Sequence, residues 1–194
     1  MSSQPQITNQ PLPADLQAVL NELDRTDEDA RQLVSGLSDA QLNWQPGPGG
    51  WSVAQCLAHL AQMNSVLTAA LRTAVRQADK NSVMPRQPIQ PGWFGRRFIN
   101  QMEAPPRRKM KTPRQGMPKA YKSGEEILRA FIAAHGELRS LIHEARDLDL
   151  NRIRFHNPFI GLLRYTVGTA LLVIGAHDRR HLWQARQVCA AMRG

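Results

Sequence analysis

Four segments of this 194-residue chain carry apolar residues at steps of three and four positions, which is the period of an amphipathic α-helix. They lie at about 14–37, 52–80, 123–147 and 165–192. No stretch alternates apolar and polar residues convincingly with a period of two, so strands are not expected. Four amphipathic helices of roughly 24 residues each are what a four-helix bundle requires. The sequence therefore predicts an all-α fold, a four-helix bundle.

Two of these segments begin with a clear helix-start signal. Ser52 followed by Gln55 has the spacing of a capping box, and Ser123 followed by Glu126 repeats it. Trp51 occupies the position before the first box, where an apolar side chain packs against the first turn. These signals predict where the second and third long helices begin.

A long basic connection, residues 81–119, separates the second and third predicted helices. It holds nine Lys or Arg residues against Glu103 alone, which leaves +8 of the formal net charge of +9, and seven of the thirteen prolines. A short amphipathic helix there could cover an apolar mouth of the bundle, stack on nucleic-acid bases or rest on anionic lipid. We expect it to cover the bundle, and we expect neither nucleic acid nor membrane as a partner. The residues of this helix are Trp93, Phe94, Arg96, Arg97, Phe98 and Ile99.

Compartment and domain organisation follow from what the sequence lacks. Its longest apolar stretch has ten residues, far short of the ~20 that span a bilayer. Its first residues lack the basic region and the apolar region that are typical of a secretory signal. Two cysteines, Cys56 and Cys189, do not make a disulfide framework. We expect a cytoplasmic protein with a flexible tail at 1–11 and one domain at 12–194.

Three histidines are the strongest candidates for chemistry. His177 and His181 stand at i and i+4 on the last predicted helix, within an apolar stripe, so both imidazoles can reach one metal ion. His59 lies between Cys56 and Met63 on the inward side of the second predicted helix. The three rings could converge on one divalent ion. Zinc or nickel suits imidazole best, and iron or manganese would also accept it.

Other polar residues near these histidines carry less specific signals. Asp178, one step from His177, is expected to be a surface or interface charge more than a support for a ligand. Asp27 lies on the apolar face of the first helix, where it could hold a ligand imidazole or be buried with an arginine. Cys56 could add a fourth ligand, a less favoured reading. Asn64 and Gln184 are expected to line the cavity or the bundle ends, and His135 and His143 to be solvated or core residues.

The sequence around the histidines resembles the DinB/YfiT-like superfamily of bacterial four-helix-bundle proteins. In that family a Trp-Ser helix start leads to one metal-binding histidine, and GGWSVAQCLAHL at 49–60 places His59 there. A His-Asp/Glu-x-x-His motif supplies two more, matching His177 and His181 in AHDRRHLWQA at 176–185. HNPFIGLL at 156–163 resembles the family's turn before the last helix, with Asn157 inserted. PPRRKMKTP at 105–113 resembles the Pro-rich connection of the DinB-like branch.

The resemblance implies an open metal site with His59, His177 and His181 as ligands and a fourth position left for water or substrate. The catalytic group would be a metal-bound water, with Asp27 and Asp178 as candidate acid–base groups. Characterised family members include metal-dependent hydrolases and transferases or isomerases that use low-molecular-weight thiols, and they are frequently dimers. We therefore predict a metal-dependent hydrolase or thiol transferase acting on a small molecule, as a homodimer. The alternative is a non-enzymatic protein, either a stress-related metal binder or a nucleic-acid binder using 81–119.

Overall fold

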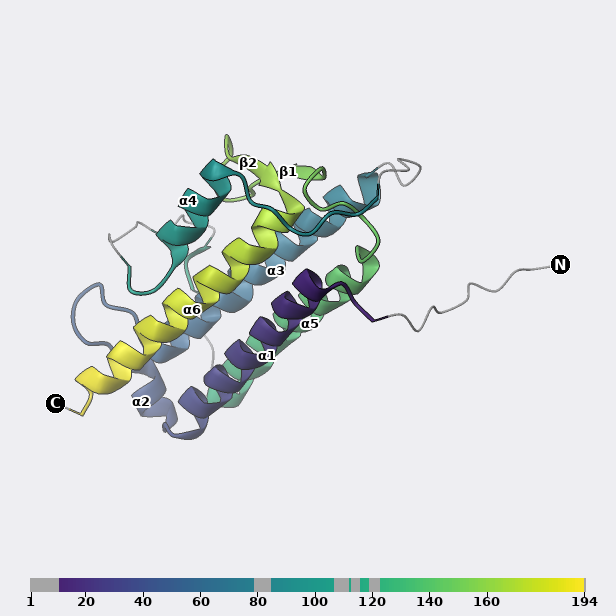
Figure 1. Ribbon diagram of the computed structural model, residues 1–194. Coiled ribbons are helices and arrows are strands. Elements are labelled where there is room, and N and C mark those ends of the chain that lie inside the picture. Colours follow the sequence, from purple (N-terminus) through teal and green to yellow (C-terminus); the bar gives the residue numbers. More distant parts are fainter. Residues whose placement is uncertain (1–10, 79–84, 107–111, 113–115, 119–122, 194) are drawn as a thin grey trace.

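Four long helices lie side by side and form the body of the protein (Figure 1). They are α1 (Ala14–Ser35), α3 (Val53–Gln77), α5 (Gly124–Glu144) and α6 (Val167–Ala191). This computed structural model describes residues 11–78, 85–106, 112, 116–118 and 123–193. Both α1 and α3 pack against α5 and against α6, so the four helices share one interior. The predicted four-helix bundle is confirmed.

Side-chain caps begin two of the long helices where the sequence predicts. At the start of α3, Ser52 Oγ accepts the backbone N–H of Gln55 at 3.1 Å, and Gln55 Oε1 accepts the N–H of Ser52 at 2.9 Å. At the start of α5, Ser123 Oγ accepts the N–H of Glu126 at 3.2 Å. These bonds satisfy backbone donors that the first helical turn leaves without a partner.

The helix boundaries differ from the predicted ones by a few residues. The first helix ends at Ser35, and a separate short helix, α2 (Asp39–Asn43), follows it behind its own capping box. The third long helix ends at Glu144 and not near 147. The predicted end of the second long helix, near Lys80, lies outside the described residues.

A two-stranded hairpin precedes the last helix. Strands β1 (Arg154–His156) and β2 (Arg164–Thr166) pair antiparallel with Phe155 opposite Tyr165, so the expectation of no strands is wrong here. Strands of three residues are too short to produce a recognisable alternation. The rings of Phe155 and Tyr165 lie 5.0 Å apart and close one end of the core.

The basic connection contains the predicted short helix, α4 (Trp93–Met102), which packs beside the first half of α6 (Figure 1). Phe98, Ile99 and Met102 face the bundle. Trp93 and Phe94 do not, because their side chains are 70% and 81% exposed. The apolar side chains that cover the bundle therefore come from the C-terminal half of the helix, while Gly95 in its first half lies close to Thr169 of α6.

In the described part of the chain, the interior has two large apolar clusters with a polar layer between them, and a small third cluster lies under α4. One cluster includes Leu23 of α1 and Leu138 of α5, and the other includes Ala30 and Phe131 of the same helices. Four buried polar side chains lie between the clusters, one from each long helix: Asp27, Asn64, His135 and Asp178.

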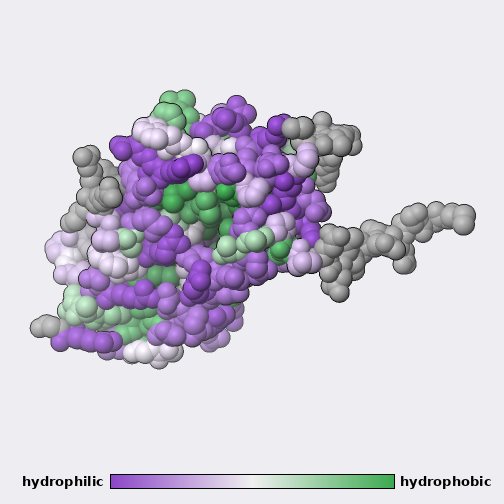
Figure 2. Space-filling view, in the orientation of Figure 1, coloured by the Kyte–Doolittle hydropathy of each residue, from purple (hydrophilic) through white to green (hydrophobic). Residues whose placement is uncertain are grey.

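The surface on the side of α1, α4 and α6 is largely hydrophilic around an apolar hollow (Figure 2). The hollow measures about 270 Å³ and is lined by Val19, Ile99 and Leu171 among others. No helix in the described ranges is long and apolar enough to cross a membrane. Residues 1–10 of the predicted N-terminal tail lie outside the described residues.

Candidate metal centre

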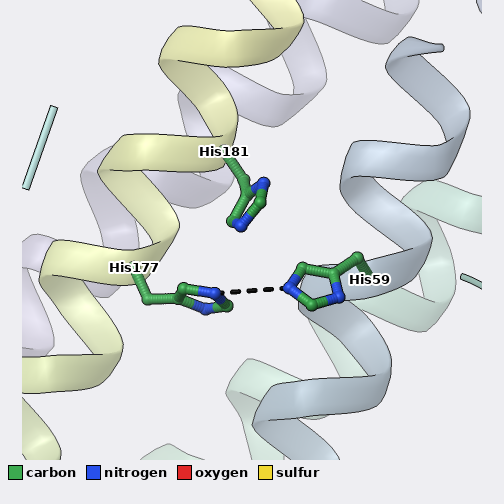
Figure 3. A group of neighbouring side chains, drawn as sticks. All are labelled: His59, His177 and His181. Carbon is green, nitrogen blue, oxygen red and sulfur yellow. Dashed lines mark hydrogen bonds between the residues drawn. The ribbon is translucent and has the colours of Figure 1, made fainter. Parts of the chain in front are cut away.

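Three histidine side chains from two facing helices converge inside the bundle (Figure 3). His59 comes from α3, while His177 and His181 lie one helical turn apart on α6. One ring nitrogen of each lies within 4.8 Å of the others, and the Nε2 atoms of His59 and His177 are 3.3 Å apart. The i, i+4 spacing therefore brings both α6 rings onto the face that meets α3, as the sequence predicts.

The protonation of His59 is fixed by the basic connection. His59 Nδ1 lies 2.5 Å from the carbonyl oxygen of Gly116. Because a carbonyl only accepts hydrogen bonds, Nδ1 must carry the hydrogen. In the neutral ring the electron pair is then on Nε2, the atom that faces His177. Metal-ligating histidines in proteins commonly donate their second ring N–H to a carbonyl or carboxylate in this way, and that hydrogen bond orients the ring.

Burial keeps the three imidazoles neutral at pH 7. It lowers the pKa of His59, although the Gly116 carbonyl and the charge of Asp178 oppose it. It also lowers the pKa of His177 well below its usual value and that of His181 to about 3, with help from neighbouring histidines and from Arg180. Neutral rings offer electron pairs to a cation without first losing a proton.

Trp51 forms one wall of the histidine cluster. Its ring stacks on His181 with centroids 5.6 Å apart and 21° between the planes, and it lies 4.9 Å from the ring of His59. The buried Nδ1 of His181 has no hydrogen-bond partner within the described part of the chain. The sequence identified Trp51 only as a helix-start residue, because its contact with α6 depends on tertiary packing.

A cavity of about 230 Å³ opens beside the histidines. Its walls come from α3, α4, α6 and the β1–β2 loop, and they are mainly apolar. Phe98, Met102 and Thr112 of the basic connection line it, so this part of the segment lies over the site, as expected. The polar residues that line the cavity beside the three histidines are Asn64, Thr112, Asn157, Tyr165 and Arg180.

Residues 22–185 match the family model of the DinB superfamily. This chain belongs to the DinB superfamily. Among solved structures, YfiT from Bacillus subtilis aligns over 100% of this chain and 94% of its own, with a TM-score of 0.62 and 16% sequence identity. YfiT is described as a probable metal-dependent hydrolase with an unusual four-helix bundle topology. At this identity the likeness concerns the fold. The comparison with curated proteins finds no match.

The DinB fold places the two candidate acids away from the cavity. Asp178 is fully buried, so the expectation of a surface or interface charge is wrong. The ~100° step from His177 turns its side chain toward α3 and α5, where it meets Asn64 and His135. Asp27 Oδ2 accepts a hydrogen bond from Arg139 at 2.8 Å, which is the predicted arginine pairing. Neither acid is among the described residues that line the cavity.

His135 joins the two acids in the polar layer. Its Nδ1 lies 2.7 Å from Asp27 Oδ1 and its Nε2 lies 3.2 Å from Asp178 Oδ2. Asn64 Nδ2 donates to Asp178 Oδ1 at 2.9 Å. Burial alone would lower the pKa of His135, but the hydrogen bonds and charges of Asp178 and Asp27 outweigh it and raise the pKa to about 9. Asp27 thus holds an imidazole, but not one of the site.

Cys56, His135 and His143 are not brought to the histidine cluster. Cys56 is buried in the apolar core, and burial raises the pKa of its thiol to about 12, so it stays protonated. His143 is exposed and His135 is a core residue, as expected. Asn64 lines the cavity. Gln184 is not among its described lining residues, but a hydrogen bond from its side chain to His181 opposes the lowering of the His181 pKa.

Proposed function

We propose that this DinB-family protein binds one divalent metal ion, zinc or nickel, through His59, His177 and His181 and hydrolyses a small molecule in the adjacent cavity. The observation that carries the proposal is the convergence of three neutral imidazoles, with the electron pair of His59 directed into the cluster by the Gly116 carbonyl. YfiT, a probable metal-dependent hydrolase with the same fold, supports the same reaction class.

Three protein ligands leave an open position, and an ion held in this way supplies Lewis-acid chemistry that polarises a carbonyl or acidifies a water molecule. The chain itself orients the ligands and limits access of water. Gly116 and Trp51 hold the rings, and Phe98 and Met102 form apolar walls beside them. Asp27 and Asp178 hold His135, so we infer a structural role for both acids.

Metal analysis of protein purified without a nickel column tests the first half of the proposal. We expect one ion per wild-type chain, and none in a variant with both His177→Ala and His181→Ala. His143→Ala is the matched control, because this histidine is exposed on α5 and should leave the ion in place. Full stoichiometry in the double variant would contradict the proposed ligands.

Turnover of a panel of esters and amides tests the second half. Metal-loaded wild-type protein should hydrolyse at least one compound, and the double variant should not, while its helical circular dichroism stays intact. Metal binding without turnover of any panel member would favour the non-enzymatic metal-binding alternative. Use of a low-molecular-weight thiol, homodimer formation and a cytoplasmic location stay predictions from the family resemblance and the sequence.

A nucleic-acid role for the basic connection predicts a different result. Binding to single-stranded DNA should then be tight, fall steeply with salt, and weaken when Arg96 and Arg97 are changed to Gln. We expect only weak binding that these changes leave unaltered, because α4 packs on the bundle.

A further inference from the structure

The cavity beside the histidines is elongated along α6. Its described lining on that helix runs from Val173 to His181, which corresponds to about 12 Å at 1.5 Å per residue. Leu67, Phe98 and Ile174 are among the residues that line it, so most of its length offers apolar contact. A molecule that fills it must bury an apolar body of several carbon atoms.

One end of this cavity carries a buried positive charge. Arg180 lines the cavity, and this residue is only 9% exposed. Its Nη1 donates to the carbonyl of Gln101 at 3.0 Å, which fixes the guanidinium at the C-terminal end of α4. Arg180 precedes His181 on α6 and lines the same cavity as the three histidines. None of the described residues that line the cavity is acidic.

The opposite end of the cavity is neutral. Asn157 Oδ1 accepts the backbone N–H groups of Phe159 and Ile160 at 2.8 and 2.9 Å, so its Nδ2 is the atom that donates to Tyr165 Oη at 2.8 Å. Burial raises the pKa of Tyr165 to about 12, so its hydroxyl stays protonated. This end presents aromatic and aliphatic surface with one hydroxyl and no charge.

We propose, on the basis of the function proposed above, that the site takes an apolar small molecule with a single carboxylate, which Arg180 holds beside the three histidines while the apolar body extends along α6 toward Tyr165. A planar guanidinium matches a carboxylate with two parallel hydrogen bonds, and the pairing gains strength where water is excluded. The carboxylate therefore sets the orientation, and the bond to be cleaved lies near the histidines.

Binding of simple probes to metal-free protein tests this inference independently of catalysis. The protein is treated with chelator, passed through a sizing column and titrated calorimetrically with phenylbutyrate, its uncharged amide, and acetate. We expect phenylbutyrate to bind at least tenfold more tightly than the amide, since only the charge differs. We also expect it to bind at least tenfold more tightly than acetate, since only the apolar body differs.

Variants at Arg180 identify the origin of the preference. Arg180→Gln should remove the tenfold advantage of phenylbutyrate over the amide, and Arg180→Lys should keep part of it. Arg186→Gln is the matched control, because this arginine lies on the same helix but pairs with Asp29 outside the cavity. Equal affinity for phenylbutyrate and its amide, or a preference that survives in Arg180→Gln, would overturn the inference.

The metal analysis described above keeps the two proposals separate. A carboxylate preference in protein that binds no metal would refute the metal site and leave the inference about Arg180 standing. One ion per chain without a carboxylate preference would do the reverse.

Discussion

Raising the pH from 6.5 to 9 should destabilise this protein, mainly through His135. This histidine is completely buried, and its two ring nitrogens face Asp27 and Asp178. Although burial opposes the charged form, the two carboxylates raise the pKa of His135 to about 9, against 6.5 for an ordinary histidine. The folded protein thus holds a proton that the unfolded chain releases.

The size of the effect follows from this difference in pKa. A raised pKa contributes stability that is fully present below pH 6.5 and is lost as the pH rises through about 9. Between these values the free energy of unfolding falls by about 1.4 kcal/mol per pH unit, or about 3 kcal/mol in all. The site histidines act in the opposite direction, because their pKa values are lowered. They cost stability as the pH falls through 6.5, so at the acid end of the window they offset part of the loss due to His135.

Urea denaturation followed by circular dichroism, with chelator present, measures the effect. Wild-type protein and a His143→Gln control should both lose stability between pH 6.5 and 9, with a contribution of about 3 kcal/mol from His135. A His135→Gln variant should be less stable at pH 6.5 and should lack this contribution of about 3 kcal/mol across the window. Should that variant not fold, a nuclear magnetic resonance titration of His135 in the wild type decides the matter. A pKa near 6.5, or equal pH dependence in wild type and variant, would refute the reasoning.

Three further outcomes are expected. Chelation of the metal should lower the melting temperature but leave the helical circular dichroism intact, because two large apolar clusters hold the bundle together without the ion. Loss of the helical signal would instead show that the metal is required for folding. Gly116→Ala should weaken metal binding about tenfold in a metal titration. The new Cβ would lie 2.8 Å from Met63 Sδ and 3.3 Å from His59 Cε1, so it would displace the ring of His59. Gly136→Ala is the control and should leave metal binding unchanged, because there is open space around this glycine. Phe131→Ala should cost about 3–5 kcal/mol in urea denaturation, since the ring is fully buried; a loss below 1 kcal/mol would contradict the packing.

The sequence predicted the four long helices and the histidine cluster because both depend on local patterns. Helical periodicity and serine caps involve residues within a few positions of one another, and the i, i+4 spacing of His177 and His181 fixes their common face. The inward stripe on α3 placed His59 opposite them. The family resemblance then linked the two helices, which periodicity alone does not do.

The sequence did not predict the polar layer, because its members are far apart along the chain. Nothing in the sequence links Asp27 with Asp178, and no motif surrounds His135. Its ion pairs with Asp27 and Asp178 join residues 108 and 43 positions away, so they exist only once three helices adopt one relative rotation. The hairpin and α2 were missed for a different reason, since elements of three to five residues give no periodic signal.

The polar layer explains why the acid of the His-Asp-x-x-His motif is next to a histidine and yet outside the cavity. Asp178 is held by His135 from α5 and by Asn64 from α3, so α6 has one rotation in which this carboxylate is paired. An unpaired buried charge is strongly destabilising, and therefore other rotations of α6 are disfavoured. His177, one residue earlier, is carried by that rotation to the Nε2 of His59. Asp178 thus positions His177 without contacting the metal site, because the two residues are neighbours on the backbone of α6.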